Sequence, residues 1–255
     1  MKSLRNCVPI LILLTTAGTQ ASTVLYNNGP FISDPGAGFG GADASVLRDS
    51  LTIFGFGFST SAPDYLADDF EVPTGEIWDI SGVQFYGYQT GSSTTSTFTS
   101  LKVQIWNGRP GDPGASVIWG NLVDDVLETS SFSGIYRVTS STLSATTRPV
   151  MSLDGAVTTT LTGGSYWIQW GGTGSLDSGP FAPPITISGQ LTTGNARKLT
   201  SSWADIVSLS STYQQGLPFQ ILGDVSAVPE PGSVLGTLLL IGSAFGVRVR
   251  PRRRC

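Results

Sequence analysis

The chain has 255 residues with a formal net charge of −4; 13% of them are charged, 32 are glycine and 15 are proline. Glycine and proline together exceed their usual share of about 12%, which favours short strands separated by turns over long helices. The sequence contains no histidine. This excludes chemistry that depends on an imidazole, such as Ser-His-Asp hydrolysis and histidine-ligated zinc.

Residues 1–21 have the pattern of a secretory signal peptide. Lys2 and Arg5 give a positively charged start, residues 7–14 are apolar, and small residues lead up to Ala21. This order of charge, apolar segment and small residues is typical of a cleaved signal, and the apolar segment is too short to span a bilayer. The alternative is a buried first strand. The sequence therefore predicts export of the remaining chain.

Residues 22–223 are predicted to form a single all-β domain, a β-sandwich or jelly roll. Residues 101–106 alternate, with leucine, valine and isoleucine on one face, and residues 166–170 alternate in the same way. Short strands separated by turn signals are typical of sandwiches and jelly rolls. The other candidate strands are residues 52–58, 77–88, 116–119, 135–139, 157–161, 185–188 and 219–222.

Glycine-rich and proline-rich segments separate these strands. The turn signals lie at residues 91–93, 109–114, 171–174 and 183–184. Glycine and proline are the strongest local signals for turns, so we expect a hairpin or flexible loop at 171–174. The best helical candidate is 121–129, which also reads as a loop followed by a strand.

The body is more acidic than the whole chain. Residues 22–227 carry 7 Lys/Arg and 17 Asp/Glu, a net charge of −10. Nucleic acids and anionic membrane surfaces are therefore poor partners for it. Cations are better ones. No cofactor is expected with the exception of calcium.

Calcium prefers six to eight oxygen ligands. The candidate ligands are Asp64, Asp68 and Asp69, joined by Asp124 and Asp125 if loops bring them together. The alternatives are solvated acidic loops, or Asp68 or Asp69 capping a turn before the next strand. Adjacent residues of a strand point to opposite faces, so we do not expect Asp68 and Asp69 to act as a pair.

Two further kinds of site are considered for the body. A carbohydrate-active enzyme needs two carboxyl groups at a set separation, and acidic residues crowd positions 64–79. A carbohydrate-binding module needs exposed aromatic rings. Trp106 and Trp167 are out of phase with the apolar faces of their strands, so they are candidates for stacking on sugar rings. The alternative is that both faces of these strands are covered and both tryptophans are core residues.

The C-terminus has three consecutive parts. A linker at 224–232 contains Pro229, Glu230 and Pro231, and residues 233–247 are apolar and uncharged. A basic tail at 248–255 follows, containing Arg248, Arg250, Arg252, Arg253 and Arg254. The apolar segment would be a short membrane-spanning helix, and the arginines would stay on the cytoplasmic side.

This arrangement resembles the PEP-CTERM sorting signal of Gram-negative bacteria. The resemblance covers about 28 C-terminal residues. It implies recognition by an exosortase, a membrane-embedded protease thought to cleave near the motif. The alternative is an ordinary C-terminal membrane anchor. The body also resembles uncharacterised β-rich extracellular bodies through residues 67–73, 85–88 and 216–219, which implies a fold type without catalytic residues.

These observations predict an exported, non-enzymatic protein of the envelope or biofilm matrix. We expect it to be anchored briefly in the inner membrane and then sorted to the surface or into an extracellular polysaccharide layer, with a structural or adhesive role. The alternative is a carbohydrate-binding module or a carboxylate-dependent carbohydrate-active enzyme.

Overall fold

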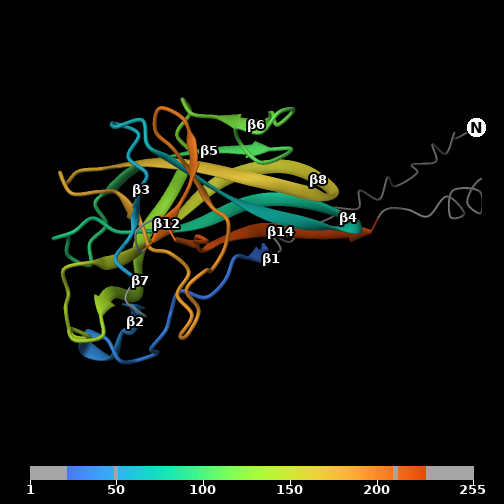
Figure 1. The fold of residues 1–255 in the computed structure, drawn as a ribbon. Helices are drawn as coiled ribbons and strands as arrows, with labels where there is room; N and C mark the ends of the chain where they lie inside the picture. The colour runs from blue at the N-terminus through green and yellow to red at the C-terminus, as the bar shows by residue number, and fades with distance from the viewer. Residues whose placement is uncertain (1–21, 49–50, 209–211, 228–255) are drawn as a thin grey trace, which may run out of the picture.

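The computed structural model describes residues 22–48, 51–208 and 212–227, and these are almost entirely β (Figure 1). One short 3-10 turn, η1 (Phe39–Gly41), interrupts the strands. The strands are β1 (Thr23–Asn27), β2 (Asp43–Leu47), β3 (Phe56–Gly57), β4 (Tyr65–Gly87), β5 (Phe98–Trp106), β6 (Val117–Asn121), β7 (Leu127–Thr139), β8 (Pro149–Gly174), β9 (Phe181–Ala182), β10 (Arg197–Leu199), β11 (Trp203–Asp205), β12 (Val207–Ser208), β13 (Tyr213–Gln214) and β14 (Phe219–Ala227).

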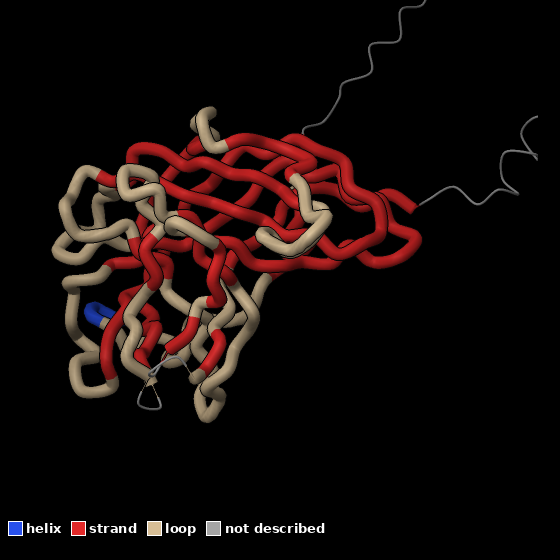
Figure 2. The backbone as a smooth tube through the Cα atoms, turned by 45° about the horizontal axis from the view of Figure 1, so that its top comes forward, coloured by secondary structure: helices blue, strands red, loops and turns tan. Residues whose placement is uncertain are grey.

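Ten of these strands form one sheet, built on the long antiparallel pair β4 and β8. Its main path runs β1-β14-β4-β8-β5-β6. The first part of β4 also pairs with β10, and the first part of β8 also pairs with β7, which carries β2 as a parallel neighbour. The all-β prediction is confirmed. The strands form a curled, mainly antiparallel sheet, and Figure 2 shows loops gathered at one end of it.

The curl brings the two halves of the sheet together around one core. The backbone of Phe85 in β4 pairs with that of Leu153 in β8. The Phe85 ring nevertheless stacks on Trp170, near the other end of β8, with ring centroids 4.6 Å apart. Similarly, a Cβ atom on Gly155 would lie 2.8 Å from Leu101 of β5. Every second side chain of each half of the sheet points inward, and these side chains pack against those of the other half. The side chains between them point outward, on opposite sides of the core.

Two predictions about individual segments are wrong, and one segment that had two readings is decided. Residues 171–174 are not a loop but the end of β8. Their glycines allow aromatic rings to lie against the strand, because a Cβ on Gly171 would be 2.5 Å from Tyr65 and one on Gly172 would be 2.9 Å from Phe58. Of the two readings of residues 121–129, the structure bears out the loop followed by a strand, because β6 ends at Asn121 and β7 begins at Leu127. Residues 185–188 form only an isolated bridge.

The predicted boundary at residue 224 is also wrong. Strand β14 continues to Ala227, because Asp224, Val225, Ser226 and Ala227 pair with β4 in register. At the other end, β1 lies antiparallel beside β14, with Thr23 opposite Gly223. The first and last strands of the described chain are therefore neighbours.

One arginine is fully buried in the loop-rich end. Arg137 of β7 is 1% exposed. Its guanidinium donates to the carbonyl oxygen of Phe54 (2.8 Å) and to the hydroxyls of Ser45 and Thr186 (both 3.0 Å). Burial lowers its pKa to about 10, so the group stays charged at neutral pH. It ties together β2, β7 and two loop segments.

No helix within the described ranges is both long and apolar enough to cross a membrane. The predicted signal peptide (1–21), sorting helix (233–247) and basic tail (248–255) lie outside those ranges.

Candidate functional site

The two tryptophans proposed for sugar stacking are brought together by the sheet. Trp106, the last residue of β5, lies directly opposite Trp167 of β8. Trp167 is buried, as the core alternative expected, whereas Trp106 is partly exposed. The indole N–H of Trp106 donates to Oε1 of Gln169 at 2.8 Å. This bond fixes the orientation of the Trp106 ring at the outer face of the sheet.

A third tryptophan and an arginine complete an aromatic cluster around this pair. Trp203 of β11 meets Trp106 edge to face, with centroids 6.3 Å apart and an interplanar angle of 87°. The guanidinium of Arg109 lies 5.8 Å from the centre of the Trp167 ring. Arg109 thus covers Trp167, and Trp106 and Trp203 remain as the partly exposed rings.

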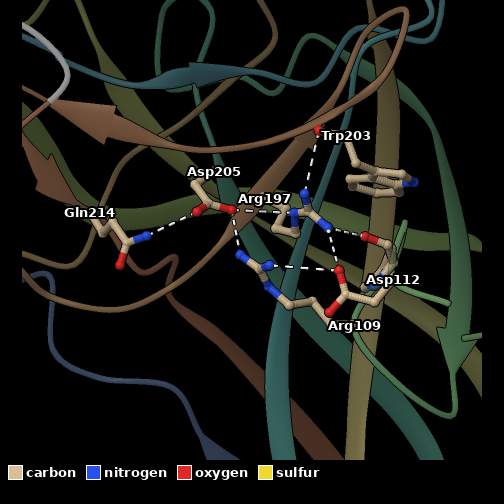
Figure 3. A network of polar contacts seen from close by, with 7 residues as sticks. Arg109, Asp112, Arg197, Trp203, Asp205 and Gln214 are labelled. Carbon is tan, nitrogen blue, oxygen red and sulfur yellow. Dashed lines mark hydrogen bonds and ion pairs between the residues drawn. The ribbon is translucent and has the colours of Figure 1, made fainter.

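Four charged side chains form a network beside Trp203 (Figure 3). Arg109 and Arg197 both bind Oδ1 of Asp205, the latter at 3.3 Å. Both also approach Asp112, at 3.7 and 3.4 Å respectively. Gln214 donates to the other oxygen of Asp205 at 2.9 Å. Exposed ion pairs contribute little to stability, so the main effect of this network is to fix the positions of its side chains.

Arg197 also holds the loop from residue 107 to 116 against β10 and β11. Arg197 donates to the carbonyl oxygens of Pro110 and Trp203. Gly111 has a φ of +91°, and a Cβ there would lie 3.0 Å from Trp203. A glycine is therefore required both for the backbone conformation and for the close approach. We name the surface formed by Trp106, Trp203, Arg109, Asp112, Arg197 and Asp205 the aromatic-ionic surface.

The chemistry of the aromatic-ionic surface suits recognition. An indole offers a flat apolar face with a polar N–H, and a few fixed polar groups beside apolar surface provide orientation and specificity for a ligand. The carboxylates of Asp112 and Asp205 are each engaged by guanidinium groups. A hollow of about 250 Å³, lined in part by Phe56, Lys198 and Asp205, adjoins the network.

The three aspartates proposed to bind calcium do not come together. Asp64 forms an ion pair with Lys198 at 2.7 Å, whereas Asp68 and Asp69 lie within β4. They therefore cap no turn, because the strand has already begun at Tyr65. Asp125 accepts hydrogen bonds from the backbone of β5 and β7, and Asp124 from Asn121. Across the described ranges no group of three or more Asp, Glu, Cys or His side chains is arranged to hold a metal ion.

Asp68 is a buried carboxyl group at the centre of a polar cluster. Its Oδ2 accepts from the side chain of Asn28 and from the backbone N–H of Leu217, both at 2.8 Å. With its amide nitrogen turned toward the carboxylates, Asn195 donates to Oδ1 of both Asp68 (3.1 Å) and Asp69 (2.8 Å). One amide thus joins two carboxyl groups that were not expected to pair. Burial, aided by the charge of Asp69, raises the pKa of Asp68 to about 8.

The sorting motif Pro229, Glu230 and Pro231 and the five tail arginines lie outside the described residues. Within them, sequence reasoning missed the charged network of the aromatic-ionic surface: Arg109, Asp112, Arg197 and Asp205. The glycines and prolines of residues 109–114 did indicate a loop. The ion pairs of that loop with residues almost 90 positions away have no local signature in the sequence.

The chain matches no protein-family model, and no curated protein sequence is significantly similar to it.

Proposed function

We propose that this protein is an exported, non-enzymatic component of the bacterial envelope or biofilm matrix, whose body attaches to extracellular polysaccharide. In this proposal the curled sheet is a variant of the β-sandwich, and the aromatic-ionic surface is its adhesive face. The signal-like N-terminus and the PEP-CTERM-like C-terminus support export, transient anchoring in the inner membrane and recognition by an exosortase.

One observation carries the adhesive role. Trp106 and Trp203, which are almost 100 positions apart in sequence, meet edge to face at the outer side of the sheet. Both rings are partly exposed, and paired arginines and aspartates lie beside Trp203. Sugar rings present apolar C–H faces and hydroxyl edges, and this surface offers a partner for each.

Replacing Trp203 or Trp106 with alanine is expected to weaken binding to polysaccharide about tenfold or more, because large aromatic side chains dominate the energy of such contacts. Binding of the full chain would be measured on an array of neutral and uronate-containing oligosaccharides. Phe39→Ala is the matched control, since Phe39 is 56% exposed and lies outside the aromatic-ionic surface. Equal binding by the wild type and both tryptophan variants would refute the adhesive role of this surface.

Replacing Arg252, Arg253 and Arg254 with glutamine is expected to reduce retention of the tail on the cytoplasmic side, because positive charges set the orientation of a membrane segment. Fractionation of host cells and intact-mass measurement would show a smaller share of correctly processed protein. Unchanged topology and processing in this variant would argue against the sorting proposal. A variant with Lys198→Gln in the body keeps the tail intact and controls for a general loss of charge.

The second candidate is a carboxylate-dependent carbohydrate-active enzyme. The raised pKa of Asp68 favours it, because a carboxyl group that stays protonated near neutral pH can serve as a general acid. However, Asp68 is 1% exposed and its oxygens already accept hydrogen bonds from Asn28 and Leu217. Release of reducing ends from an oligosaccharide, lost in Asp68→Asn but kept in Asp69→Asn, would support this alternative over adhesion.

A further inference from the structure

A second hollow lies on the opposite outer side of the curled sheet. It has a volume of about 260 Å³ and is lined by the segment from Gly29 to Ile32 together with Asn27, Tyr86 and Gln220. Tyr86 and Gln220 alternate with Phe85 and Phe219, which are fully buried. Their side chains therefore face away from the core on the β4-β14 side, whereas Trp106 faces away from it on the β8-β5 side. Phe85 of β4 and Trp170 of β8 stack across the core, so their outward-facing neighbours lie on opposite sides of it.

A row of polar side chains crosses the outer face of the sheet, and its first two members, Asn27 and Gln220, line the hollow. Asn27 of β1 lies opposite Gln220 of β14, which lies opposite Gln84 of β4, which lies opposite Asp154 of β8. Gln84 accepts from the Tyr86 hydroxyl at 2.6 Å and donates to Asp154 at 2.7 Å. The Tyr86 ring is thereby held in a fixed orientation at the edge of the hollow.

Two amides of this row are free to bind a ligand. The side chains of Asn27 and Gln220 have no hydrogen-bond partner among the described residues, although both line the hollow. An amide group carries both donors and an acceptor, so it can bind both the hydrogen and the oxygen of a sugar hydroxyl.

Apolar groups form the other wall. Phe31 packs on Tyr86 with ring centroids 4.5 Å apart, and Pro30 and Ile32 extend this wall toward solvent. An aromatic and aliphatic wall facing two amides is the composition expected of a site for a molecule with an apolar face and hydroxyl edges. The volume is below the ~300 Å³ at the lower limit of pockets for drug-sized ligands, which suits a single sugar unit.

The uncharged lining of the hollow and the acidic body around it favour neutral sugars over anionic ones. None of its lining side chains carries a formal charge at neutral pH, and the body as a whole is strongly acidic. An anionic sugar would thus gain no ion pair here and would be repelled at longer range.

We propose that this hollow is a second saccharide site, specific for a neutral hexose unit, and that the body cross-links polysaccharide chains through its two opposite faces. The cross-linking part rests on the proposed function of the aromatic-ionic surface, whereas the neutral site stands independently of it.

The test uses the full chain in mild detergent and a panel of neutral disaccharides containing glucose, galactose or mannose, observed by saturation-transfer NMR. At least one disaccharide is expected to bind the wild type, with affinity falling about tenfold or more in the double variant Asn27→Ala/Gln220→Ala, because two hydrogen-bonding groups are lost. Gln190→Ala, an exposed amide outside the hollow, is the control. Thermal melting would verify that the double variant is folded.

Loss of binding in the double variant but not in Trp203→Ala supports the second site. A wild type that binds no disaccharide of the panel, or a double variant that binds as the wild type does, overturns it. Failure of the aromatic-ionic surface is a separate outcome, recognised by unchanged array binding in Trp203→Ala. For cross-linking, beads that carry the selected disaccharide are mixed with beads that carry an oligosaccharide bound by the aromatic-ionic surface on the array. The wild type is expected to aggregate this mixture, and the double variant and Trp203→Ala are each expected not to. Beads that stay dispersed with the wild type, or aggregate equally with the variants, overturn the cross-linking.

Discussion

Replacement of Arg137 by methionine is expected to lower the free energy of unfolding by at least about 3 kcal/mol. The guanidinium satisfies the carbonyl oxygen of Phe54 and the hydroxyls of Ser45 and Thr186 inside the protein. Methionine fills much of the same volume but makes none of these bonds, and each buried polar group left unpaired costs about 1–3 kcal/mol. Chemical denaturation monitored by tryptophan fluorescence would measure the loss.

Arg148→Met is the matched control for this experiment. Arg148 immediately precedes β8, and its carbonyl oxygen accepts from the backbone N–H of Arg137. Its guanidinium is 3.9 Å from the centre of the Phe54 ring while the side chain remains partly exposed. Loss of a partly exposed cation–π contact costs about 0.5–1 kcal/mol. Arg137→Lys keeps the charge but cannot reach three partners at once, so we expect it to resemble methionine. If Arg137→Met and Arg148→Met are equally stable, the proposed bridging role of Arg137 is wrong.

The stability of the protein is expected to fall as the pH rises from about 4 to about 8. The pKa of Asp68 is 3.8 in its ordinary state and about 8 in the folded protein, chiefly because the group is buried. The folded state therefore holds a proton that the unfolded state has lost. Below pH 4 both states are protonated and the stabilisation is complete; it is lost progressively as the pH approaches 8. A shift of about four pKa units at about 1.4 kcal/mol per unit corresponds to a loss on the order of 5 kcal/mol.

The absence of histidine makes this experiment unusually direct. Histidine is the side chain that ordinarily titrates between pH 5 and 8, and this chain has none. Unfolding by urea at a series of pH values would show the slope in the wild type. In Asp68→Asn the slope should disappear, whereas in Asp69→Asn, whose carboxyl group shares the Asn195 amide, it should remain. A flat profile in the wild type would contradict the buried, protonated state of Asp68.

The sequence predicted the parts of the fold that local alternation determines. Leu101, Val103 and Ile105 lie in the core as their spacing indicated, because a strand that is half buried must place every second residue inward. The glycines at 171–174 were misread, since a glycine that admits an aromatic ring from another strand has the same sequence signature as one that makes a turn. Only the tertiary position of Tyr65 and Phe58 distinguishes the two.

The candidate sites were predictable only in part. Trp106 and Trp167 were identified because they are out of phase with their apolar neighbours, and the structure places them side by side. The contribution of Trp203, Arg197 and Asp205 depends on a pairing between β10 and β4 that joins positions about 130 apart. Asp68 was read as a candidate for a loop because nothing in an isolated segment reveals that a carboxyl group will be enclosed by distant backbone.

The register of β14 determines how tension would act on the protein. Ser226 and Ala227 still pair with β4, so a single residue separates the sheet from Pro229, and five residues separate Ala227 from the apolar segment that begins at Ser233. The six Cα–Cα steps from Ala227 to Ser233 span at most about 20 Å when fully extended. A body held by that segment would stay close to the membrane surface. A pull on the tail would act along β14, which is hydrogen-bonded between β1 and β4, and would therefore strain many backbone hydrogen bonds together rather than open them one after another.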